Sequence, residues 1–144
     1  MKHGVVVVTL LAALLPLGLA QGRRSATYVA HAKVASAASG ADLATGPDFT
    51  VMMMKRTAAG RVEVHAKETD TFYVLDGEAT FVTGGTMIGG RTSRPNQQLG
   101  ERIEGGETYH LTRGDVIVIR AGTPHWFKQV PRSIRYYVVK VIKP

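Results

Sequence analysis

The chain has 144 residues, contains no cysteine and carries a formal net charge of +7. Without cysteine, neither a disulfide nor a thiolate metal site can form, so any bound metal must be held by imidazole and carboxylate groups. The basic residues are scattered rather than gathered in a run with interleaved aromatics. This excludes the usual nucleic-acid-binding pattern and indicates a solvated surface that could steer an anionic substrate.

The first twenty residues are expected to be a signal peptide rather than part of the fold. Lys2 precedes an uncharged apolar run, residues 5–19, which is shorter than the roughly 20 residues of a membrane span. A Gly-Leu-Ala sequence that ends at Ala20 suits signal peptidase, so we expect cleavage there and a secreted or periplasmic mature chain. The alternative is an uncleaved signal anchor. The remaining length fits one domain and leaves no room for two.

Residues 21–48 are expected to form an N-terminal segment with a short helix over 28–38. Alanines surround Val34 in this stretch, and Gly40 follows as a stop signal. The small apolar content of this helix indicates a lid or a brace at the edge of the domain rather than a core helix.

From Phe49 onward, short β-type runs alternate with glycine and proline, which predicts an all-β domain over residues 49–142. Several runs are apolar on both faces, so the strands are expected to lie between layers or to wrap into a barrel. The Asp76-Gly77 pair predicts a two-residue type I′ hairpin. Residues 84–110 hold seven glycines and predict a long irregular insertion, either a functional cover or a disordered loop, with strands at its ends over 87–88 and 109–111 as an open alternative. The predicted strands are residues 49–55, 61–65, 71–75, 78–83, 115–119, 126–128 and 134–142.

Four ionisable residues in two segments form the candidate site. Glu63 and His65 lie two positions apart on a predicted strand, so their side chains point to the same face. Such groups are costly to bury unless they pair, face solvent or bind a cation. Asp70 follows soon after, and His125 follows an apolar strand and a Gly/Pro turn. A sheet that joins the two segments makes a mixed nitrogen and oxygen metal site; the alternative is a solvated edge strand carrying Glu63 and His65.

The first segment resembles the first motif of the cupin superfamily of small β-barrels. That motif runs His-x-His, four residues, Glu, six residues, Gly. Aligned on Gly77, it places Glu63 and His65 at the two histidine positions and Asp70 at the glutamate position. The spacing is kept, while two of the residue types differ.

The second segment resembles the second cupin motif, which runs Gly, five residues, Pro-x-Gly, two residues, His. Aligned on Gly114, it places Arg120 at the proline position, Gly122 at the glycine position and His125 at the histidine position. Again the spacing is kept, and only Arg120 departs from the pattern.

The resemblance implies a single-domain, cupin-type jelly-roll barrel that binds one divalent metal ion. Its ligands would be His65, Asp70 and His125, a two-histidine, one-carboxylate set that leaves positions open for substrate and oxygen. Glu63 would be a fourth ligand or a catalytic general base. Fe, Mn, Ni and Zn all suit these donors. The alternative is a hydrogen-bonded cluster without metal.

Two further residues are predicted to bind substrate. Arg120, at the usual proline position beside His125, is the candidate for an anionic group; its alternative is a surface arginine or a partner of Asp115. His110 follows Tyr109 and could reach the pocket mouth, with a surface role as the alternative.

The resemblance implies an enzyme of dioxygenase, isomerase or lyase type, with an oxidoreductase as the first expectation, acting on a small oxygen-rich molecule. The alternative is a non-catalytic, sugar-like ligand-binding cupin with a structural metal or none. Many cupins pair through edge strands, so a homodimer is expected. Neither a nucleic-acid partner nor membrane association after signal cleavage is expected.

Overall fold

A computed structural model describes residues 26–143, so the expected signal peptide lies outside the described residues. No helix within 26–143 has the length and apolar character needed to cross a membrane. The elements in chain order are α1 His31–Ser36, β1 Ala41–Thr45, β2 Phe49–Arg56, β3 Val62–His65, β4 Glu68–Gly77, β5 Ala79–Thr83, β6 Thr86–Ile88, β7 Arg91–Arg94, β8 Gln97–Gly100, β9 Arg102–Glu104, β10 Glu107–Leu111, β11 Val116–Ile119, β12 His125–Gln129 and β13 Ile134–Ile142.

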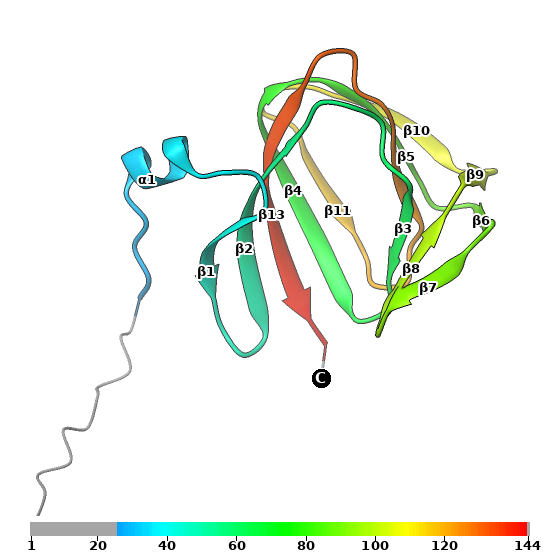
Figure 1. The fold of residues 1–144 in the computed structure, drawn as a ribbon, viewed down its shortest axis with the longest axis horizontal. Helices are drawn as coiled ribbons and strands as arrows, with labels where there is room; N and C mark the ends of the chain where they lie inside the picture. The colour runs from blue at the N-terminus through cyan, green and yellow to red at the C-terminus, as the bar shows by residue number, and fades with distance from the viewer. Residues whose placement is uncertain (1–25, 144) are drawn as a thin grey trace, which may run out of the picture.

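Two antiparallel sheets face each other and enclose the barrel interior (Figure 1). The five-stranded sheet has the order β1-β2-β13-β4-β11, so the last strand of the chain lies between two early ones. The six-stranded sheet has the order β10-β5-β12-β3-β8-β7, and β6 pairs with β9 separately. The predicted all-β jelly roll with a short helix is confirmed.

The two-residue period of the strands fills the interior. On β13, Tyr136 and Val138 are buried, whereas the alternate residues Tyr137 and Val139 are only partly covered. The inward aromatic rings pack against one another with centroids 4.8–5.8 Å apart, which is the usual range for favourable ring contacts. These rings belong to Phe72, Phe81, Phe127 and Tyr136.

The predicted hairpin at Asp76-Gly77 is wrong. β4 pairs with β11 and β13, whereas β5 pairs with β10 and β12, so this turn carries the chain from one sheet to the other. Gly77 has a φ of +79°, and a Cβ added there would overlap the backbone carbonyl of Ser133. Glycine is therefore needed for a sheet crossing and a close backbone approach, not for a hairpin.

Residues 84–110 form short strands, so the predicted irregular insertion is wrong, whereas the strands left open at its two ends are present as β6 and β10. β7 and β8 make a hairpin whose turn holds Asn96 at a φ of 62°, and β8 pairs with β3. This pairing sets Gln97 opposite His65. Several of the glycines occupy positive-φ positions between these strands: Gly84, Gly85, Gly89 and Gly105.

The N-terminal segment contributes a strand as well as the helix. α1 is shorter than predicted, and no side chain caps its N-terminus. Arg135 donates to the carbonyl oxygens of Val34 and Ala35 at 2.9 and 2.8 Å, which ties the end of α1 to the outside of the five-stranded sheet. β1 pairs with β2, so the sheet begins at Ala41, ahead of the expected start at Phe49.

Candidate metal centre

The barrel interior holds a cavity of about 120 Å³ between the two sheets. The four sequence-predicted ligands all line it: Glu63, His65, Asp70 and His125. Much of the remaining lining is apolar or aromatic: Met52, Met54, Phe72, Phe127, Tyr136 and Val138. The cavity therefore combines a polar cluster with an apolar and aromatic wall.

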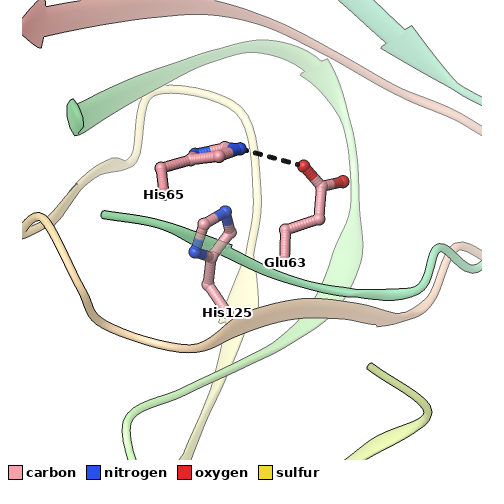
Figure 2. A group of neighbouring side chains, drawn as sticks. All are labelled: Glu63, His65 and His125. Atoms are coloured by element: carbon pink, nitrogen blue, oxygen red, sulfur yellow. Dashed lines mark ion pairs between the residues drawn. The ribbon is translucent and has the colours of Figure 1, made fainter. Parts of the chain in front are cut away.

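Glu63, His65 and His125 converge in this cavity, and we call them the ligand triad (Figure 2). β3 supplies the first two on one face, and β12 supplies His125, which pairs in register with Glu63. One potential ligand atom from each side chain lies within 4.8 Å of the other two. The two motifs thus meet through adjacent strands, as the sequence predicts.

Both imidazoles of the ligand triad are oriented through Nδ1. His65 Nδ1 lies 3.0 Å from Asp70 Oδ2, and His125 Nδ1 lies 3.1 Å from the carbonyl oxygen of Thr123. Both partners are acceptors, so each Nδ1 carries a proton and each Nε2 is left for the cavity. Metal-binding histidines are commonly fixed in this way. Two imidazole nitrogens and the Glu63 carboxylate therefore fit a divalent ion.

Asp70 lies beside the ligand triad, but Lys140 engages its carboxylate. Lys140 Nζ lies 2.9 and 3.0 Å from the two Asp70 oxygens and 2.8 Å from Glu68 Oε2. Asp70 Oδ2 is 4.0 Å from His125 Nε2. The geometry groups Asp70 with His65 and Glu68, whereas the resemblance implied that Asp70 binds the metal with the two histidines. The Asp70 carboxylate meets Nδ1 of His65, the ring nitrogen on the side away from Glu63.

Arg56 holds the remaining oxygen of Glu63. Its Nη2 donates to Glu63 Oε1 at 2.8 Å, and its Nε donates to the Tyr136 hydroxyl at 3.3 Å. The guanidinium carbon lies 4.7 Å from the centre of the Phe127 ring, within reach of a cation–π contact. Arg56 is therefore a fixed positive group in the cavity wall.

Comparisons with known proteins agree with this architecture. The structure of BH2720 from Bacillus halodurans superposes with a TM-score of 0.58 at 17% identity, covering 86% of each chain. The cupin domain of Cnp3 from Schizosaccharomyces pombe superposes with a TM-score of 0.56 at 14% identity, covering 76% of this chain and 67% of that one. The chain has the cupin fold. No protein-family model matches the sequence, and no curated protein is recognisably similar to it.

Ionisation in the cavity is set by ion pairs and hydrogen bonds, which outweigh burial. Burial alone would raise the pKa of Glu63, but the hydrogen bond to His65 and the charge of Arg56 lower it to about 2. Burial alone would lower the pKa of His65, but the hydrogen bonds to Asp70 and Glu63 raise it to about 9. Without an ion, His65 therefore carries a proton on each ring nitrogen, and the charged ring lies between the carboxylates of Asp70 and Glu63.

The pKa values of Asp70 and His125 are both lowered, but for different reasons. Burial opposes ionisation of Asp70, but the hydrogen bond to His65 and the charge of Lys140 hold the Asp70 pKa below its usual value. For His125, burial dominates and lowers the pKa, so this imidazole is neutral and can offer a lone pair.

Sequence reasoning missed Arg56 and Lys140, although a signal for both exists. Arg56 lies in phase with Met52 and Met54 on β2, and Lys140 lies in phase with Tyr136 and Val138 on β13. In each case, the alternating pattern puts a cation on the inward face.

Two cavity residues come from the glycine-rich region. Gln97 Nε2 lies 3.3 Å from His65 Nε2, and Arg94 Nε donates to Gln97 Oε1 at 2.5 Å. Their positions depend on the pairing of β8 with β3, and no local sequence pattern predicts this pairing.

The two predicted substrate-binding residues do not line this cavity. Arg120 is exposed and follows β11, where the preceding Ile119 points into the core. His110 is exposed on β10, with its Nε2 3.1 Å from Glu78 Oε2. The structure brings neither residue to the ligand triad.

Proposed function

We propose that this cupin binds one divalent ion through Glu63, His65 and His125 and is an enzyme acting on a small, oxygen-rich molecule. The observation that carries the proposal is the matched orientation of the two imidazoles. Each Nδ1 is held by an acceptor, and each Nε2 is left for an ion beside a carboxylate. A bound ion would supply Lewis acidity or oxygen activation.

The size and lining of the cavity support a small substrate. About 120 Å³ is well below the roughly 300–1,000 Å³ of pockets for drug-sized ligands. Arg56 and Arg94 line it and favour negatively charged oxygen groups, while the amide of Gln97 offers a further polar contact. The aromatic wall would hold the rest of the molecule and keep water out.

A metal-free binding protein is the second candidate, and the charge balance of the cluster favours it. Arg56 pairs with Glu63, and Lys140 pairs with Asp70 and Glu68. Among the described residues, no buried side-chain nitrogen or oxygen lacks a hydrogen-bond partner. Such a network is satisfied without an ion.

Elemental analysis of the mature protein, purified without chelator, tests the metal. We expect close to one divalent ion per chain, of Fe, Mn, Ni or Zn. The double variant His65→Ala/His125→Ala should lose the ion, whereas His110→Ala, the same change at an exposed histidine outside the cavity, should keep it. Full retention of metal in the double variant would overturn the proposal.

A turnover assay separates the enzyme from the binding protein. Small carboxylic acids and sugars are incubated in air with the protein loaded with each of the four metals, and consumption is followed by mass spectrometry. We expect one compound to be consumed. A compound that raises the melting temperature but is never converted with any metal would favour the binding protein.

We also propose that the chain is exported, as its N-terminal pattern suggests. Residues 1–20 supply the short apolar run and the small residues before the expected cleavage site. N-terminal sequencing of the protein from its native host should begin at Gln21. A sequence that begins at Met1 or Lys2 would show that the segment is retained.

We further propose that two copies of this cupin pair through the outside of β11, β4 and β13. Six outward-facing side chains make an uncharged surface there, which we call the outer apolar face, and four of them are well exposed. The chain as a whole is strongly basic, so an uncharged face lets two copies approach without repulsion. A uniform apolar surface also suits a two-fold interface, in which the same patch meets itself. The face consists of Tyr73, Val116, Val118, Tyr137, Val139 and Val141.

A further inference from the structure

Lys140 places an ammonium group inside the barrel, next to the candidate metal site. Its side chain is only 16% exposed and comes from β13, in phase with the buried Tyr136 and Val138. Its contacts reach both Asp70 oxygens and Glu68 Oε2, all within 3.0 Å. Nζ also lies 3.3 Å from His65 Nδ1, and an ammonium group has only three protons to donate, so these contacts leave none of them free.

These contacts fix what Asp70 can do. Its carboxylate is 2% exposed, and both of its oxygens accept from Lys140, while Oδ2 also meets Nδ1 of His65. An ion that bound Asp70 directly would lie beside the Lys140 ammonium, and two cations at such short range repel strongly inside a protein. The cation position at Asp70 is therefore already filled.

The far side of His65 is free of this conflict. Its Nε2 lies 3.4 Å from Glu63 Oε2, on the ring edge away from the Asp70 contact. A carboxylate that holds one ring nitrogen of a histidine orients the other toward the metal and makes it a better donor. Asp70 is placed to do this for His65.

We propose that Lys140 is a resident cation that keeps Asp70 off the metal, so that Asp70 positions His65 through Nδ1 and the ion takes Glu63, His65 and His125 as its protein ligands. In its account of the ligand set, this inference rests on the proposed metal function. It makes Asp70 a positioning residue rather than a ligand. It also leaves more coordination positions open for substrate than a four-ligand site would.

Zinc titration of three variants tests the inference: Lys140→Met, Asp70→Asn and the double variant. Methionine keeps the approximate length of lysine without its charge, and the exposed Lys143 offers Lys143→Met as a matched control. Binding is followed by calorimetry with Zn²⁺, and the ligand number is followed from the absorption spectrum of the Co²⁺ form. Circular dichroism checks that each variant folds.

Asp70→Asn should still bind one zinc, with an affinity about 10- to 100-fold lower, the loss typical of an outer-shell group. Lys140→Met should bind zinc at least about tenfold more tightly, because Asp70 loses its cation and joins the ligands. The double variant should lose that gain, and Lys143→Met should match the wild type. Loss of all zinc binding in Asp70→Asn, or an unchanged affinity in a folded Lys140→Met, would overturn the inference. Should Lys140→Met fail to fold, Asp70→Asn decides alone.

The same titration separates this inference from the proposed function. If the wild type binds no zinc but Lys140→Met binds one ion through Asp70, the resident cation is confirmed and the metal function fails. If the wild type binds zinc but Asp70→Asn abolishes it, the metal function stands and the inference fails. If neither wild type nor Lys140→Met binds zinc, both are overturned.

Discussion

Glu63 stands where the cupin motif has a histidine, and the structure shows what a carboxylate contributes there. One oxygen accepts from Arg56 at 2.8 Å, and the other faces His65 Nε2 at 3.4 Å. Its pKa of about 2 makes it a weak proton acceptor near neutral pH, because a general base works best when its pKa lies near the working pH. Of the two roles that the sequence left open, a metal ligand is the better supported.

Glu63→Gln should therefore remove the metal, and not merely turnover. The amide keeps the shape of the side chain but loses its charge and pairs poorly with Arg56, so we expect metal affinity to fall by more than the roughly 10- to 100-fold of an outer-shell change. Glu68→Gln is the matched control, since Glu68 contacts Lys140 and lies outside the ligand triad. Elemental analysis measures both. Retained metal with lost turnover in Glu63→Gln would instead identify Glu63 as the base.

Loss of a proton from His65 should make the metal-free protein less stable in alkali. Its pKa is about 9 in the fold against an ordinary 6.5, so the folded state holds the proton more tightly than the unfolded state. This contribution is complete below pH 6.5 and is lost as pH rises through 9, by up to about 3 kcal/mol. Urea unfolding of chelator-treated protein at pH 6.5 and pH 9 measures it.

The variant His65→Gln supplies the control for this pH dependence. It cannot titrate, so the difference in unfolding free energy between it and the wild type should shrink as pH rises from 6.5 to 9. A constant difference would show that His65 is not the titrating group. Metal affinity should change in the opposite direction and rise with pH, because the ion displaces the His65 proton.

For single residues, the sequence predicts a place in the cavity where a motif or the two-residue period of a strand identifies the residue. The spacing of the motifs located all four acidic and imidazole side chains of the cavity. The period of two also marks Arg56 and Lys140 as inward-facing cations. The contact between Lys140 and Asp70 was beyond prediction, because it depends on the pairing of β13 with β4, in which these two residues lie in register.

Among the elements, the turn after β4 shows why a local signal can mislead. An Asp-Gly pair between two apolar runs is typical of a hairpin, since both central positions take positive φ. Here Gly77 does take a positive φ, but the strands on either side join different sheets. The Asp-Gly pair sets the local backbone angle. Which strands pair with each other depends on contacts between residues that are far apart in the sequence.

Gly77→Ala should destabilise the fold much more than Gly114→Ala does. Both glycines have positive φ, but a Cβ at Gly77 meets the backbone of Ser133, whereas a Cβ at Gly114 meets nothing within 4 Å. We expect a loss of about 1 kcal/mol for Gly114→Ala from the backbone conformation alone. Gly77→Ala should lose about 3 kcal/mol or more, because the two chain segments must also move apart. Urea unfolding of both variants measures the difference, and equal losses would contradict the close approach.

For the whole molecule, the barrel could be predicted from the sequence, but the strands that extend its six-stranded sheet beyond β3 could not. Two motifs with fixed spacing define strands that must meet, so the architecture follows from a few positions. The glycine-rich residues 84–110 carry no comparable period, yet they add β7 and β8 beside β3. Their register depends on pairing with β3. The sequence alone therefore did not predict that Gln97 lines the cavity.

The outer apolar face gives a prediction at the scale of the assembly. Val118 is 57% exposed on β11, the edge strand of the five-stranded sheet, and a stable interface buries about 800 Å² on each partner around such apolar centres. Val118→Glu should place a carboxylate in the outer apolar face of both copies and shift the protein from dimer to monomer, raising the dissociation constant at least about tenfold. Light scattering coupled to size-exclusion chromatography measures the mass. Thr108→Glu makes the same charge change on the exposed edge strand β10 of the other sheet and should leave the dimer intact. If the wild type is a monomer, or if only Thr108→Glu dissociates a dimer, the outer apolar face is not the interface.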